Sequence, residues 1–230
     1  MWIAKISGVT NFDAAMSVDV SDEFAIGVII EEISNVRQIS KFDARRIFAS
    51  VENCIKIAEI YPRSLEEVFD IIDTCQPEMI QINGDFCDKV ERVMELQSVV
   101  PLPIIASIIL DRSTLEANIV NKDVIKAIEV LDPFVHALNI NLPLGEYWKS
   151  SSKRKKIIEL LEKVLSSTQK PVIIGGGLNS SNVGKIIKAI QPAAVDVSSS
   201  VERVQGIKDP LLMQEFLEEV YKYKELLTGV

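Results

Sequence analysis

Residues 172–179 read VIIGGGLN, a short apolar run that ends in three glycines and an asparagine. A helical pattern from Ser180 to Ile190 follows it, so the stretch is typical of a strand, a loop and a helix in succession. Residues 194–202, AVDVSSSVE, repeat this arrangement with serines in the loop, ahead of a helical pattern from Pro210 to Leu227. Such alternation predicts βαβ units built around a parallel sheet.

The same alternation continues back to the N-terminus and gives eight units. The expected strands are Trp2–Ser7, Ala25–Ile30, Cys54–Ile60, Met79–Ile82, Ile104–Ile109, Phe134–Asn139, Val172–Ile174 and Ala194–Val197. The expected helices are Asn11–Val20, Ser40–Ala49, Ser64–Thr74, Phe86–Gln97, Ser113–Leu131, Lys153–Ser166, Ser180–Ile190 and Pro210–Leu227. Eight units in 230 residues fit a closed (β/α)8 TIM barrel that forms a single domain over residues 1–230. A flavodoxin-like open sheet is the alternative, but it normally has fewer units.

The composition narrows the class of protein. With 47% apolar and 25% charged residues it is typical of a globular domain, and 25 basic against 33 acidic residues argue against nucleic acid or an anionic membrane as partner. Cys54, Cys75 and Cys87 lack C-x-x-C spacing, so they are interpreted as reduced packing residues, and no metal site is expected. No apolar run reaches the ~18 residues of a membrane span, and the first residues lack a signal-peptide pattern. A cytoplasmic location is therefore expected.

The loops after the last two strands are the first place to seek a ligand. In TIM barrels a phosphate is frequently bound by the loops that follow strands 7 and 8. Glycines let the backbone approach a ligand closely, and free N–H groups at a helix start favour an anion. The predicted phosphate-binding residues are Gly176, Gly177, Ser198, Ser199 and Ser200. The alternative is that the glycines only make a tight turn and the serines only cap a helix.

Five segments carry a family resemblance. They are IIGGGLNSSNV, AVDVSSSVE, KISGVTNFDAA, SNVRQIS and MIQINGD. Together they resemble phosphoribosylanthranilate isomerase of tryptophan biosynthesis, with the segments in the same order from strand 1 to strand 8. The resemblance implies an Amadori rearrangement of a phosphorylated aminoaldose to an aminoketose, without metal or organic cofactor. It also implies a phosphorylated small-molecule ligand, and we expect a monomer or a homodimer.

The resemblance identifies two proton-transfer positions, and both are substituted. The family cysteine that acts as general base corresponds to Ser7, and the aspartate that acts as general acid corresponds to Asn139. A thiol with a pKa near ~8.5 can be tuned to a thiolate, whereas a serine hydroxyl needs an adjacent base. An asparagine has no titratable proton.

The other site positions are partly retained. Arg37 matches the arginine that holds the anthranilate carboxylate, and its planar fork suits that group. Asp196 is also retained, whereas the family histidine of strand 4 becomes Asn83 and the glycine that ends the strand 8 loop becomes Ser200. The glycine-rich lid after strand 6 is replaced by Leu142–Trp148.

These substitutions leave the activity open. General acid and general base groups each contribute roughly 10²- to 10⁴-fold, so weak or altered isomerase activity is expected. The alternative is a catalytically silent relative that binds a phosphorylated metabolite. Another kind of phosphate-handling barrel is a weaker third reading, because the metal ligands and lysine pattern of such enzymes are missing.

Two further side chains have expected roles. Lys5 lies two residues before Ser7 and faces the same interior side of the barrel. It could act as a base with a lowered pKa, but pairing with Asp196 is the favoured interpretation. The single histidine, His136, is expected to point away from the interior and to pack between the barrel and the helices.

Overall fold

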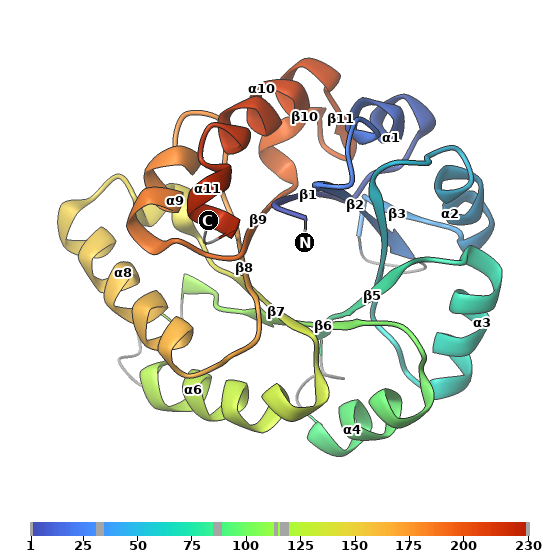
Figure 1. Ribbon diagram of the computed structural model, residues 1–230, viewed down its shortest axis with the longest axis horizontal. Coiled ribbons are helices and arrows are strands. Elements are labelled where there is room, and N and C mark those ends of the chain that lie inside the picture. The colour runs from blue at the N-terminus through green and yellow to red at the C-terminus, as the bar shows by residue number, and fades with distance from the viewer. Residues whose placement is uncertain (1, 31–34, 85–88, 113–114, 116–119, 229–230) are drawn as a thin grey trace.

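The computed structural model describes residues 2–30, 35–84, 89–112, 115 and 120–228. Within this part of the chain, parallel strands form a closed ring with helices around its outside (Figure 1). The barrel strands are β1 (Ala4–Ser7), β2 (Phe24–Ile30), β4 (Ile55–Ile60), β5 (Met79–Ile82), β6 (Ile104–Ile109), β7 (Ala137–Asn141), β8 (Val172–Gly175) and β9 (Ala194–Val197). Strand β1 pairs with both β9 and β2, which closes the ring. The prediction of a TIM barrel is confirmed.

The helices and minor elements follow the expected alternation. The α-helices are α1 (Phe12–Val18), α2 (Lys41–Phe48), α3 (Leu65–Cys75), α4 (Val90–Val99), α6 (Val120–Leu131), α7 (Leu144–Tyr147), α8 (Ser151–Ser166), α9 (Val183–Ile190), α10 (Pro210–Tyr221) and α11 (Lys224–Thr228). Two 3₁₀ turns are η2 (Asp132–Phe134) and η3 (Ser199–Val201). Strand β3 (Gln38–Ile39) extends the sheet beside β2, and β10 (Glu202–Val204) forms a hairpin with β11 (Ile207–Lys208). No described helix is long and apolar enough to cross a membrane.

Capping side chains help to fix where three of the helices begin. The side chains of Asn11, Ser40 and Ser64 accept hydrogen bonds from backbone N–H groups in the first turns of α1, α2 and α3. These bonds satisfy donors that have no partner within the helix. The sequence also offers Asp85 and Ser113 as capping residues of two further helices, but both lie outside the described residues.

Apolar side chains occupy two regions. The larger lies between the barrel wall and the helices. The smaller fills the barrel interior where the strands begin, and consists of Trp2, Ala25, Ile57, Ile105, Ala137, Ile173 and Ala194. This apolar plug closes one end of the barrel, so a ligand site belongs at the other end, where the strands finish.

One strand is displaced from its expected position. Strand β7 begins at Ala137 instead of Phe134 because Phe134 is the last residue of a 3₁₀ turn, Asp132–Phe134, that contains Pro133. His136 therefore precedes the strand, is exposed, and accepts a hydrogen bond at Nδ1 from the Ile104 N–H at 3.1 Å. The expectation that it packs between barrel and helices is wrong.

The cysteines are packing residues where the structure describes them. Cys54 and Cys75 are buried free thiols, whereas Cys87 lies outside the described residues. Burial, together with the neighbouring Asp19 carboxylate, raises the pKa of Cys54 to about 12. A thiol in this state is a poor nucleophile.

Candidate active site

A layer of buried polar side chains lies directly above the apolar plug. Glu59, Ser107, Asn139 and Asp196 each follow a plug residue by two positions on the same strand. Because alternate residues of a strand face the same side, all four enter the barrel interior. Lys5 and Gln81 complete the layer.

Lys5 is the cation at the centre of this layer. Its side chain is fully buried, and Nζ lies 3.2 Å from Asp196 Oδ2, 3.3 Å from Glu59 Oε1 and 2.5 Å from Gln81 Oε1. Burial alone would lower the pKa of Lys5, but the charges of Asp196 and Glu59 outweigh burial and raise it above 10.5. Pairing with Asp196 is confirmed, and a lysine with a raised pKa is not a base near neutral pH.

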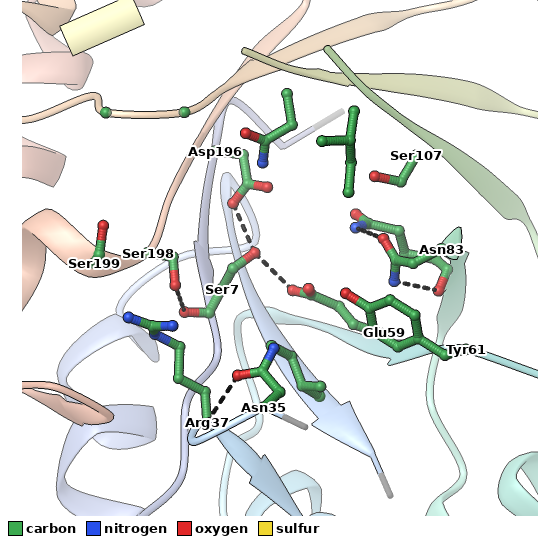
Figure 2. Close-up of a pocket in the computed structure, with 16 residues that line it drawn as sticks. Ser7, Asn35, Arg37, Glu59, Tyr61, Asn83, Ser107, Asp196, Ser198 and Ser199 are labelled. Carbon is green, nitrogen blue, oxygen red and sulfur yellow. Dashed lines mark hydrogen bonds between the residues drawn. The ribbon is translucent and has the colours of Figure 1, made fainter. Parts of the chain in front are cut away.

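Ser7 bridges the two carboxyl groups. Its Oγ lies 2.6 Å from Glu59 Oε1 and 2.7 Å from Asp196 Oδ1, as Figure 2 shows by the two dashed lines that meet at Ser7. A hydroxyl has a single proton to donate. The single proton on Oγ is therefore shared between the two carboxyl oxygens.

Asn139 lies beneath this bridge. Its Nδ2 donates to Asp196 Oδ2 at 2.9 Å and to Gln81 Oε1 at 3.1 Å. Its Oδ1 is buried with no hydrogen-bond partner among the described residues. The side chain is 1% exposed and does not line the pocket above, whereas Asn141, two residues further along β7, does.

A polar pocket opens above the layer and brings most of the expected site residues together. Its described lining is Ser7, Ile29, Asn35, Arg37, Glu59, Tyr61, Gln81, Asn83, Ser107, Ile109, Asn141, Gly176, Gly177, Asp196, Ser198 and Ser199. Three expected site residues lie outside it. Lys5 and Asn139 belong to the layer below, and Ser200 donates its hydroxyl to the Leu178 carbonyl.

The loops that follow β8 and β9, called here the two C-terminal loops, contribute residues with unused backbone donors to the pocket lining. Within the described part of the chain, no residue accepts a hydrogen bond from the amide N–H groups of Gly176, Gly177, Ser198 or Ser199. Several such groups at one pocket rim favour an anion.

The glycines also have a packing role. A Cβ at Gly176 would lie 1.9 Å from the Leu142 carbonyl oxygen, and one at Gly177 would lie 2.8 Å from the Gly145 nitrogen. Both glycines have positive φ, at 101° and 68°. The segment Leu142–Trp148 contains α7 and packs onto this loop, with the Leu144 N–H donating to the Gly176 carbonyl at 3.1 Å. Packing against Leu142–Trp148 therefore requires glycine at both positions, independently of any ligand.

Buried charges support the serine loop from behind. Lys208 Nζ donates to the Ser198 carbonyl at 3.0 Å and to Glu202 Oε1 at 2.8 Å. Burial lowers the pKa of Lys208 even though Glu202 is next to it. Burial would raise the pKa of Glu202, but hydrogen bonds from Arg37 and Lys208 lower it to about 2.

Sequence reasoning missed several of these groups, above all Glu59, Gln81, Lys208 and Glu202. One signal for Glu59 was available. It stands in IKIAEI, a strand that is otherwise apolar on its inward side, and a charged residue is seldom buried without a partner.

Comparison with known proteins extends over almost the whole chain. Residues 4–219 match the family model of N-(5'phosphoribosyl)anthranilate (PRA) isomerase. The curated N-(5'-phosphoribosyl)anthranilate isomerase of Methanocaldococcus jannaschii is 28% identical over 225 residues, which cover 95% of this chain and 96% of that protein. The Oceanobacillus iheyensis protein of the same name is 29% identical over 219 residues, with 95% and 96% covered.

Solved structures show the same fold. The phosphoribosyl anthranilate isomerase of Thermotoga maritima superposes with a TM-score of 0.77 at 22% identity and covers 96% of this chain and 100% of its own. The Thermococcus kodakaraensis enzyme superposes with a TM-score of 0.74 at 23% identity, covering 96% and 99%. The match of the family model to residues 4–219 decides the assignment. This chain belongs to the phosphoribosylanthranilate isomerase family of tryptophan biosynthesis.

Proposed function

We propose that the protein binds a phosphorylated sugar derivative of the phosphoribosylanthranilate type and isomerises it, aminoaldose to aminoketose, with altered proton-transfer groups. The observation that carries this proposal is the convergence of the two C-terminal loops and two carboxyl groups on one pocket. The loops would hold a phosphate while Glu59 and Asp196 lie within reach of the sugar carbons.

The phosphate would be held by backbone amides. Gly176 and Gly177 on one loop and Ser198 and Ser199 on the next offer donors without protein acceptors in the described chain. The Lys208 ammonium, which donates to the Ser198 carbonyl and hydroxyl, adds a positive charge behind the loop. Backbone donors and a nearby cation together suit a dianion.

The aryl carboxylate of such a substrate would meet Arg37. Two of its five N–H groups bind Glu202, which fixes the plane of the guanidinium at the pocket wall. Ile29 and Ile109 line the same pocket and offer apolar surface to an aromatic ring.

A catalytically silent binding protein is the second candidate. The observation in its favour is that Ser7 and Asn139 carry no group that titrates near neutral pH, and that Asn139 is shielded from the pocket. Purified protein mixed with freshly made phosphoribosylanthranilate separates the two, because isomerisation quenches anthranilate fluorescence. Turnover by the unchanged protein contradicts the silent reading, whereas turnover only in a Ser7→Cys/Asn139→Asp variant supports it.

Binding is tested by thermal unfolding with inorganic phosphate and with reduced 1-(o-carboxyphenylamino)-1-deoxyribulose 5-phosphate. This compound is the ligand of a solved phosphoribosyl anthranilate isomerase complex. Both ligands should raise the melting temperature, since they bind the folded state. Ser199→Asp, which places a carboxylate at the pocket rim, should abolish the shift. Ser98→Asp, on the exposed surface of α4, should leave it unchanged. No shift at millimolar ligand with the unchanged protein contradicts the proposal.

A further inference from the structure

Glu59 is a buried carboxyl group that reaches the pocket with one oxygen free. Its Oε1 contacts the Ser7 hydroxyl at 2.6 Å and Lys5 Nζ at 3.3 Å. Its Oε2 has no hydrogen bond to any described residue, yet it is not among the fully buried unpaired atoms, so it retains access to the pocket. One oxygen is therefore fixed by the protein and the other faces the space that a ligand would fill.

The neighbouring strand is shaped to admit this carboxyl group. A Cβ at Gly27 would lie 1.8 Å from Glu59 Oε1, so any side chain at that position would displace the Glu59 carboxyl group from Ser7. Gly27 is also the register partner of Ser7 across β1 and β2. The absence of a side chain at Gly27 thus leaves room for the Glu59 carboxyl group to reach Ser7.

We propose that Glu59 is the base that carries the substrate proton from C2 to C1, with Ser7 and Lys5 as positioning residues that hold Oε1. This inference rests on the proposed function, because it needs a phosphosugar bound in the pocket.

Asp196, Arg37 and Ser7, which also line the pocket, fit this role less well. Asp196 accepts hydrogen bonds from Ser7, Asn139 and Lys5, so both of its oxygens are engaged. Arg37 stays protonated at all relevant pH values. The Ser7 hydroxyl is neutral and needs a base beside it, and Glu59 is one of the two carboxyl groups within reach.

The proposed step balances in protons and electrons. Once the sugar ring has opened to the C1=N iminium, Glu59 Oε2 takes the C2 proton, the C2–H pair forms a C1=C2 bond, and the C1=N pair moves to nitrogen. Protonated Glu59 then returns that proton to C1 as the C2 hydroxyl becomes a ketone. The proton released from that hydroxyl equals the one taken up by the ring oxygen on opening, so the net change is isomerisation.

Glu59→Gln is the first test, because glutamine keeps an acceptor at Oε1 and loses only the base. We expect kcat for phosphoribosylanthranilate to fall about 100-fold or more, while the affinity for the reduced ribulose phosphate changes less than about threefold. With C2-deuterated substrate the isotope effect on kcat should rise, since proton transfer becomes slower than every other step. Glu215→Gln, an exposed change on α10, should match the unchanged protein in all three measurements.

Glu59→Gly with added formate is the second test. A small carboxylate that enters the vacated space should restore turnover in proportion to its concentration, and chloride should not. The inference is overturned if Glu59→Gln keeps kcat within about threefold, or if the unchanged protein binds the reduced analogue without any turnover. Failure of the unchanged protein to bind that analogue at all is a different result, because it overturns the proposed function and the role of Glu59 with it.

Discussion

Arg37 and Glu202 form a two-point ion pair, in which Nε donates to Oε1 at 2.6 Å and Nη2 donates to Oε2 at 2.9 Å. Glu202 lies on the β10–β11 hairpin and Arg37 on the segment before β3, so the pair joins opposite ends of the chain at the pocket wall. Lys208 binds the same carboxylate and also Ser198. Glu202 is therefore linked both to Arg37, which is proposed to bind the substrate carboxylate, and through Lys208 to the Ser198 loop, which is proposed to bind the phosphate.

Glu202→Gln should destabilise the protein by about 3 kcal/mol at pH 7, because it leaves the buried Lys208 ammonium without its carboxylate. Urea unfolding measures the change, with Glu215→Gln as the exposed control. A loss below about 0.5 kcal/mol for Glu202→Gln would contradict the role of this carboxylate.

The advantage of Glu202 over glutamine should also depend on pH. Its pKa falls from 4.5 to about 2 on folding, so the stabilisation is complete above pH 4.5 and is lost as the pH falls toward 2. The Arg37 side chain is 18% exposed, so solvent screens its interaction with Glu202. The pH-dependent part of the stabilisation is therefore about 2 kcal/mol. The difference in unfolding free energy between the two proteins should therefore shrink from pH 7 to pH 3, and a constant difference would argue against the lowered pKa.

Lys5→Met should cost about 3–5 kcal/mol, because it removes the cation between the buried carboxyl groups of Glu59 and Asp196. Adding Glu59→Gln should recover part of the loss, since one buried negative charge then disappears. A double-mutant cycle by chemical denaturation gives the coupling between the two positions. Simple additivity of the two single changes would show that they do not interact.

The fold was predictable from the chain because each barrel strand is short, apolar and followed by an amphipathic helix. The placement of two loops at the pocket was predictable too, since β8 and β9 are followed by glycine and serine runs. The start of β7 was not, because the 3₁₀ turn Asp132–Phe134, which contains Pro133, takes up the first residue of the expected strand. That displacement left the exposed His136 ahead of the strand.

The contact between Ser7 and Glu59 could not be predicted, because it joins residues 52 positions apart on different strands. It depends on two features that one strand alone does not reveal: the register of β1 against β2 and the missing side chain at Gly27. Asn139 and Asn141 present a similar difficulty. Both face inward, and only their height in the barrel decides that Asn141 lines the pocket and Asn139 lies below it.

Gly27→Ala should destabilise the protein by about 1–3 kcal/mol through overpacking, because the new methyl group collides with Glu59 Oε1. In a Glu59→Ala background the same change should cost much less, since the obstructing carboxyl group is gone. Thermal and urea unfolding of the four proteins give the coupling. An equal cost in both backgrounds would place the strain against the Ser7 backbone, 3.3 Å from the added atom, instead of against Glu59.

Asn139→Asp should weaken the protein at pH 7. The Asn139 amide donates to Asp196 Oδ2 at 2.9 Å, and a carboxylate there would turn that hydrogen bond into contact between two negative charges. We expect a loss of about 2–4 kcal/mol, in the range for a buried charge without a partner. The loss should shrink as the pH falls, because the new carboxyl group is protonated more readily in the folded state and can then donate to Asp196. Urea unfolding at pH 7 and pH 5 measures this, with the exposed change Gln97→Glu as control. A stability that matches the unchanged protein at pH 7 would contradict the expected repulsion between the two carboxyl groups.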